Sequence, residues 1–80
     1  MNIERILWVD SAWSSGWKRR DEVLRDTGIV DITTVGFVMN EDERQVVVCM
    51  SVDAQFDDQK KYDGFIAIPK VAILSREVIA

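Results

Sequence analysis

The chain has 80 residues, 48% of them hydrophobic, and ten Lys and Arg against fourteen Asp and Glu give a net charge of −4. So short a chain forms one small domain, residues 1–80, with no room for separate catalytic and cofactor domains. An acidic chain also lacks the Lys- and Arg-rich surface that grips phosphates, so nucleic-acid binding is disfavoured.

The first predicted element is a strand over residues 3–9, which are rich in Ile, Leu, Trp and Val and apolar on both faces. The next residues, 10–17, collect three Ser and one Gly, a composition that favours a turn or loop. We therefore expect this strand to end near Asp10.

A short helix is predicted over residues 17–26, because Trp17 and Leu24 are spaced to share one helical face. Ser14 or Ser15 stands where a residue capping the amino end is wanted. A helix of two to three turns is marginal in isolation. We therefore expect Trp17 and Leu24 to hold it against the sheet.

Two strands then follow, over residues 30–39 and 44–52, where β-branched and other apolar residues alternate along the chain. The four polar residues between them, 40–43, predict an acidic hairpin loop. These strands are expected to be neighbours in an antiparallel sheet.

The last third of the chain opens with a long polar stretch, residues 53–63, and then predicts a short fourth strand at 65–68. Pro69 withholds a hydrogen-bond donor there, and residues 70–72 predict one tight turn. The alternation over residues 73–79 predicts a fifth strand.

The order of the predicted elements is strand, helix, three strands, turn and strand. Short antiparallel strands with a kink before the last one describe a mainly β fold with one short helix. We predict a small five-stranded antiparallel barrel, SH3-like or Sm-like, because closure removes the exposed sheet edges. An open α+β sheet with the helix covering one face is the alternative.

The chain contains no histidine, which excludes Ser-His-Asp and Cys-His sites and removes the commonest metal ligand. Its four glycines are isolated and form no phosphate loop. We therefore expect no catalytic residue, no metal and no cofactor, and a protein that is not an enzyme. The single Cys49 suits a reducing compartment, and without a membrane span we expect a soluble, cytoplasmic protein.

The three tryptophans lie close together in the first part of the chain. Trp8 and Trp17 are expected in the core. Trp13 lies among small hydroxyl residues, where an indole suits stacking on a flat ligand or gripping a partner peptide. Asp10 and Ser11 are polar candidates beside it, although Asp10 would equally well hold the turn by accepting backbone hydrogen bonds.

The chain carries four short segments in this order: Trp8-Val9-Asp10-Ser11, Gly16-Trp17, Thr34-Val35-Gly36-Phe37, and Ile68-Pro69-Lys70 followed by Ile73. Together they resemble a group of small uncharacterised phage and prophage proteins of similar length, and the resemblance covers nearly the whole chain. Thr34 stands where Ser is usual, and Val71 stands where a small polar residue often follows the Lys.

The resemblance carries no established activity, but it implies a binding module that acts on a host component, by binding a host protein or by sequestering a nucleotide-like ligand in anti-defence. Such a ligand needs stacking aromatics, polar donors and a cation. The candidate ligand- or partner-binding residues are Asp10, Ser11, Trp13, Trp17, Thr34 and Lys70.

Two other functional classes stay open. The local cluster of Lys18, Arg19, Arg20 and Arg25 would serve a nucleic-acid-binding barrel, and a structural role in assembly is the third possibility. Three Trp, three Phe and many Val exceed what five short strands enclose. We therefore expect a homo-oligomer.

Overall fold

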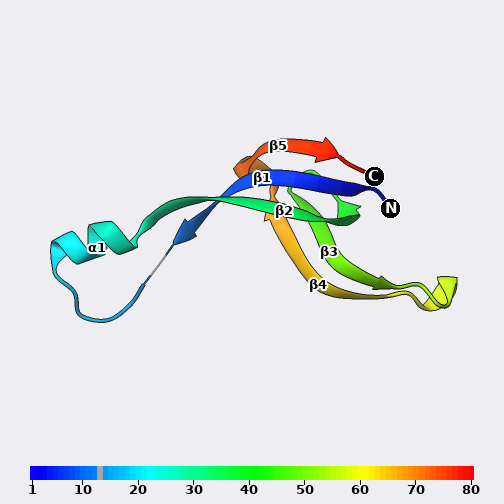
Figure 1. Cartoon of the computed structure of the whole chain (residues 1–80), viewed down its shortest axis with the longest axis horizontal. Helices are drawn as coiled ribbons and strands as arrows, with labels where there is room; N and C mark the ends of the chain where they lie inside the picture. The colour runs from blue at the N-terminus through cyan, green and yellow to red at the C-terminus, as the bar shows by residue number, and fades with distance from the viewer. Residues whose placement is uncertain (13) are drawn as a thin grey trace.

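The computed structural model describes residues 1–12 and 14–80, so the prediction made for Trp13 lies outside the described residues. Five strands, one α-helix and two short 3₁₀ turns follow one another along the chain (Figure 1). Their bounds are β1 (Ile3–Ala12), α1 (Arg20–Asp26), β2 (Gly28–Glu41), β3 (Gln45–Asp53), η1 (Asp57–Gln59), β4 (Lys61–Pro69), η2 (Lys70–Ala72) and β5 (Ile73–Val78).

The five strands form one antiparallel sheet with the order β4-β3-β2-β1-β5. The predicted class, mainly β with five antiparallel strands and one short helix, is confirmed. The predicted turn over residues 70–72 is confirmed as η2, which joins β4 to β5. β4 and β5 remain the two edges of the sheet, so its closure into a barrel is not confirmed.

A small apolar core lies inside the bend of the sheet. It is built from five buried side chains on β1, β3 and β4: Ile6, Trp8, Val46, Val48 and Ile68. β1 and β4 are not neighbours in the sheet, so their side chains meet only because the sheet curls around this core. The prediction that Trp8 is a core residue is confirmed.

The β1–β2 hairpin continues past the core and carries α1 at its end, away from β3, β4 and β5 (Figure 1). No residue of α1 is buried, and Trp17 is fully exposed. The predictions that Trp17 is a core residue and that the helix packs on the sheet are therefore wrong. The physical reason is strand length: β1 runs to Ala12 and β2 begins at Gly28, so paired strands carry the helix beyond the sheet.

The helix is also shorter than predicted, and Arg19 precedes it with no side-chain cap. Capping by Ser14 or Ser15 is thus wrong. At the other end of the chain β4 is longer than predicted, because Tyr62 and Asp63 pair with β3. Within the described residues, no helix is long and apolar enough to cross a lipid bilayer.

Candidate functional site

Thr34 holds a core residue in place. Its side-chain oxygen accepts a hydrogen bond from Trp8 Nε1 at 2.9 Å. The N–H of a buried indole needs an acceptor, and Thr34 on the neighbouring strand supplies it. This hydroxyl is therefore already occupied in the folded chain.

Asp10 and Ser11 lie on the outer part of β1, where the strand pairs with the first residues of β2. Asp10 Oδ1 accepts a hydrogen bond from the backbone N–H of Ser11 at 2.8 Å. Trp17 lies beyond the end of the strand with its indole exposed. Asp10, Ser11 and Trp17 are accessible to a partner.

Lys70 lies at the start of η2, and its Nζ is 2.8 Å from Glu41 Oε2. Glu41 also binds Arg76 through both carboxylate oxygens, at 2.9 and 3.0 Å. Arg76 in turn binds the buried Glu4 with two hydrogen bonds, at 2.8 and 3.0 Å. Two acids and two bases thus form a neutral network that links β5, β1, the end of β2 and η2.

The network changes the acidity of its members. Hydrogen bonds from Arg76 and then from Lys70 lower the pKa of Glu41 to about 2, from an ordinary value of 4.5. The carboxylates of Glu41 and Glu4 raise the pKa of Arg76 above its ordinary value. Glu41 and Arg76 therefore stay charged at neutral pH, and Lys70 already has an anionic partner in Glu41.

The predicted residues that the structure describes do not come together within one chain. Along β1 and β2, Thr34 pairs with Ile6 and Ser11 pairs with Ile29. Five residues of strand, about 16 Å at 3.3 Å per residue, separate these two pairs. The described candidates therefore form no single site in an isolated chain.

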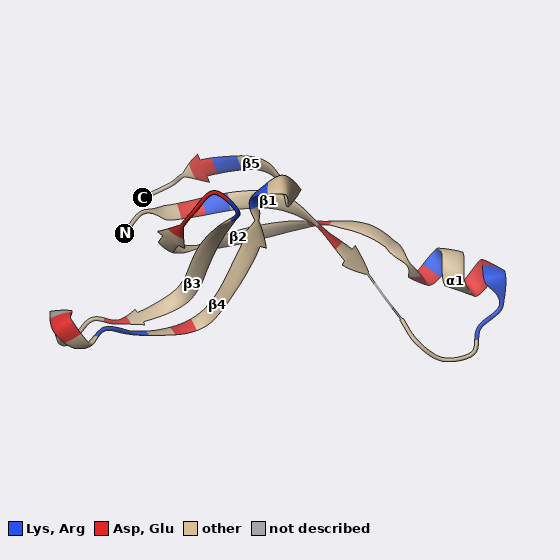
Figure 2. Ribbon diagram, turned by 180° about the vertical axis from the view of Figure 1, so that it is seen from behind, with Lys and Arg blue, Asp and Glu red and all other residues tan. Residues whose placement is uncertain are grey.

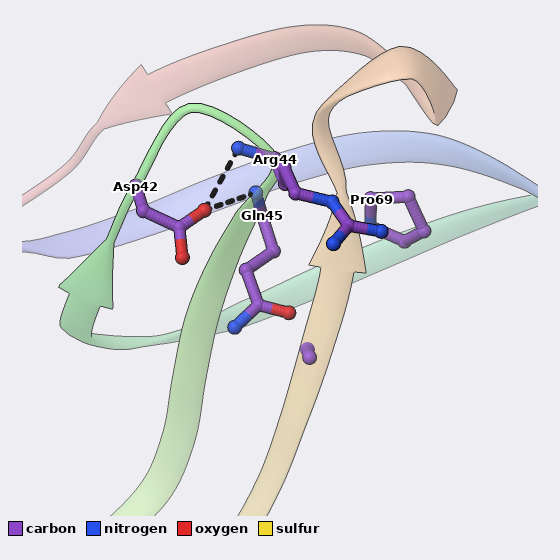
Figure 3. Close-up of a pocket in the computed structure, with 5 residues that line it drawn as sticks. Asp42, Arg44, Gln45 and Pro69 are labelled. Carbon is purple, nitrogen blue, oxygen red and sulfur yellow. Dashed lines mark hydrogen bonds between the residues drawn. The ribbon is translucent and has the colours of Figure 1, made fainter.

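A pocket of about 310 Å³ lies beside Lys70, where the β2–β3 turn meets the end of β4 (Figure 3). Its lining residues are Asp42, Arg44, Gln45, Ala67 and Pro69. A backbone hydrogen bond connects this pocket to Lys70, because the N–H of Lys70 donates to the Arg44 carbonyl at 2.9 Å.

The turn that carries this pocket is ordered by one carboxylate. Asp42 Oδ1 accepts the backbone N–H of Arg44 at 2.8 Å and that of Gln45 at 3.0 Å (Figure 3). Asp is common at such positions because its carboxylate accepts hydrogen bonds from backbone N–H groups of the same turn. The side chain of Arg44 extends toward Pro69 at the end of β4 (Figure 3).

Arg44 is the notable cation of the pocket. Within the described part of the chain, its guanidinium lies within ion-pair distance of no carboxylate. Lys18, Arg19 and Arg25, by contrast, each have an acidic partner in or beside α1. Figure 2 shows this mixture of blue and red on the helix.

Sequence reasoning missed this pocket because it treated the acidic turn as a loop and Arg44 as an ordinary first residue of a strand. The kink at Pro69 and Lys70 is the signal in the sequence for one side of the pocket, whereas no local pattern marks Arg44 and Gln45 as the residues that face it across the sheet. Gln45 pairs with Pro69 only through the β3–β4 register, which the sequence did not predict.

A smaller pocket of about 250 Å³ lies on the outer part of the β3–β4 hairpin, lined by Ser51, Val52, Asp53, Lys61, Tyr62 and Asp63. Its charged side chains are two acids and one base, which makes it a poorer anion site than the Arg44 pocket.

Comparison with protein-family models, curated proteins and solved structures gave no match to this chain. The chemistry of the side chains is therefore the basis for a functional proposal.

Proposed function

We propose that this chain is a non-enzymatic binding module of phage or prophage origin that holds a small nucleotide-like ligand of the host cytoplasm in the Arg44 pocket. One observation carries the proposal: a guanidinium with no described acidic partner faces a pocket of about 310 Å³. Guanidinium groups bind phosphate through paired N–H donors. Sequestration of such a ligand would be the anti-defence activity that the phage resemblance implies.

The rest of the pocket suits the other parts of a nucleotide. Asp42 accepts hydrogen bonds and Gln45 both donates and accepts, as a base edge or a ribose hydroxyl requires. Pro69 adds an apolar surface against which a flat ring packs. The volume lies at the low end of the range for ligand sites, which favours one nucleotide unit over a larger ligand.

The proposal predicts that Arg44→Ala weakens binding of mononucleotides and cyclic nucleotides at least tenfold, because the phosphate loses its paired donors. Thermal shift across a nucleotide panel, followed by calorimetry on the best ligand, measures this. Arg20→Ala is the matched control, since it removes one exposed cation from the distant helix and leaves the pocket intact.

Other outcomes separate the alternatives. If binding survives Arg44→Ala but is lost in Trp13→Ala or Trp17→Ala, the ligand binds at the tryptophans and not in the Arg44 pocket. No shift with any nucleotide would contradict the proposal and favour a host protein as partner.

The nucleic-acid alternative has less support, because three of the four residues in the basic cluster, Lys18, Arg19 and Arg25, are paired with acids. Binding that falls steeply with salt would favour it. The assembly alternative has one observation in its favour, the two free sheet edges, which offer unpaired backbone groups to another chain.

We further propose that the fold is an open form of the SH3-like or Sm-like barrel. The support is the strand order, with β5 beside β1, and the core that β1 and β4 share across the bend. The network of Arg76, Glu41 and Lys70 joins β5 to η2, which follows β4. Side-chain ion pairs thus connect the ends of the sheet where backbone pairing between β4 and β5 would complete a barrel.

A further inference from the structure

The outer part of the β1–β2 hairpin has no partner in its own chain. We call this part the arm; of its residues 9–31 the structure describes 9–12 and 14–31. It consists of the ends of β1 and β2 together with α1, and it projects from the core along the long axis of the molecule (Figure 1). A two-stranded hairpin is at best marginally stable in water without a third strand or a packed face. The arm therefore needs a surface to pack on.

The surface area of the chain indicates how large that surface is. The chain exposes 6230 Å², about 1,300 Å² more than the roughly 4,900 Å² of a compact 9.2 kDa monomer. Its radius of gyration is 16.4 Å, against about 12 Å for a compact domain of 80 residues. A standard interface covers about 800 Å² on each partner, so the excess of about 1,300 Å² is more than enough for one such interface per chain.

The arm exposes five large apolar side chains among its polar ones. Trp17 is fully exposed, Ile29 is 78% exposed and Leu24 is 60% exposed, and Val23 and Val30 are exposed as well. Within α1 no residue is buried, so its apolar side chains contribute nothing to the core of this chain. Several large exposed apolar side chains on one projecting part of a chain, here the loop, α1 and the start of β2, are typical of a surface that is covered by a protein partner.

Six of the nine charged side chains of the arm form ion pairs with one another. Lys18 lies 2.7 Å from Asp26, Arg25 lies 3.0 Å from the same carboxylate, and Arg19 lies 2.9 Å from Glu22. Residues 9–31 contain four basic and five acidic side chains, whereas the rest of the chain carries three of the four net negative charges. Two arms therefore meet with little repulsion, while an arm and an oppositely charged partner would attract each other only weakly.

We propose that the arm docks on the arm of a second copy of this chain, in a two-fold symmetric dimer. A two-fold interface uses the same patch on both subunits, and it closes after two chains. The nearly neutral, apolar arm fits that requirement, since each copy presents Trp17, Leu24 and Ile29 to the other. This inference rests on the arm alone and does not depend on the Arg44 pocket.

The test replaces arm residues that are not buried in the chain's own core. Trp17→Asp with Leu24→Asp should halve the mass measured by light scattering after size exclusion, from twice 9.2 kDa to 9.2 kDa. The matched control is Phe56→Asp with Phe65→Asp, which changes two exposed aromatic residues on the β3–β4 hairpin and should leave the dimer intact. Thermal unfolding and far-UV circular dichroism check that each variant folds.

A mixing experiment distinguishes arm-to-arm docking from docking of the arm on the β3–β4 hairpin. If the arm bound that hairpin, the arm variant and the hairpin variant would each keep one good surface, and their mixture would form a heterodimer. For arm-to-arm docking the mixture contains only dimers of the hairpin variant and monomers of the arm variant. A heterodimer, a wild-type monomer at every concentration, or an arm variant that stays dimeric would each overturn the proposal.

Proteolysis provides a second measurement. Trypsin cleaves after basic residues, and the arm contains four of them, Lys18, Arg19, Arg20 and Arg25. Docking should slow cleavage in the wild-type arm at least tenfold relative to the arm variant. Equal cleavage rates in the two proteins would contradict the proposal even if the chain associates elsewhere.

Discussion

Arg76 connects three parts of the fold through one guanidinium. It lies on β5, binds Glu4 on β1 with two hydrogen bonds, and binds Glu41 at the end of β2. The side chain of Glu4 is only 7% exposed. A buried carboxylate without its cation is far more costly than an exposed one, so Arg76 is required as long as Glu4 is present.

The lowered pKa of Glu41, about 2 against 4.5, predicts how stability changes in acid. Because the folded chain holds this carboxyl in its charged form, its stabilising contribution is complete above pH 4.5 and is lost as the pH falls toward 2. Glu41→Gln lacks that contribution at every pH. The difference in unfolding free energy between wild type and variant should therefore shrink from pH 6 to pH 2 in urea titrations.

The control for this prediction is Glu77→Gln, which makes the same change of charge in an exposed ion pair with Arg5. An exposed pair contributes at most about 1 kcal/mol, so this variant should remain close to wild type throughout. A Glu41→Gln difference that stays constant between pH 6 and pH 2 would show that the network does not titrate as proposed.

At the scale of elements, β2 and β3 come unusually close at Gly36. A Cβ built on this residue would lie 2.7 Å from the carbonyl oxygen of Cys49. Gly36→Ala should therefore destabilise the protein by about 2 kcal/mol, because two backbones must separate to admit one methyl group. Urea unfolding measures this directly.

Two variants examine the cause. Val35→Ala changes the neighbouring residue, which is half exposed, and should cost less than 1 kcal/mol. Cys49→Ala added to Gly36→Ala should restore no stability, since the clash is with the backbone and not with the thiol. Rescue by Cys49→Ala would show that the side chain, rather than the strand approach, makes glycine necessary.

The helix shows where element prediction failed. Its existence and its end at Asp26 are predicted correctly from the sequence, but Trp17, whose spacing to Leu24 supported the prediction, lies outside the helix, which begins at Arg20. The position of the helix does not follow from the sequence, because an apolar helix face is normally expected to pack on the sheet. The pairing of β1 with β2, which carries α1 past the core, extends to Ala12 and Gly28. Ala and Gly have a weak preference for strands, so the sequence alone does not predict that the strands reach these residues.

At the scale of the whole molecule, the chain is 54 Å long and only 25 and 21 Å across. Only six apolar side chains are buried among the described residues. A core of this size contributes little stability in an 80-residue domain, and such domains commonly gain the remainder from association. The elongated shape of the chain thus gives the proposed homo-oligomer a physical basis.

Association predicts a concentration-dependent unfolding temperature. If folding and dimer formation are linked by mass action, a hundredfold rise in protein concentration should raise the midpoint by about 5 °C or more. Trp17→Asp with Leu24→Asp should remove this dependence while leaving the chain folded. Differential scanning fluorimetry measures the unfolding midpoint over a hundredfold range of protein concentration. A wild-type midpoint that stays constant over this range would contradict linked dimerisation.

The candidate site was predictable only in part. Lys70 was identified from the kink at Pro69, and it lies beside the pocket, where its backbone N–H bonds to Arg44. Thr34 was proposed for a ligand, but its hydroxyl accepts the hydrogen bond of Trp8. The sequence shows which residues carry a hydroxyl or a positive charge. It does not show which residue each one binds, because that partner lies on a strand far away along the chain.

The amino-acid sequence by itself determined the class of the fold, because alternation of apolar residues and the punctuation by Gly and Pro are local properties of the chain. Five strands, one short helix and the turn before the last strand all follow from it. Only the tertiary structure decided that the sheet stays open, that the helix stands off the core, and that Arg44 faces a pocket. These features depend on strand register and strand length, which are set by contacts between residues far apart in sequence.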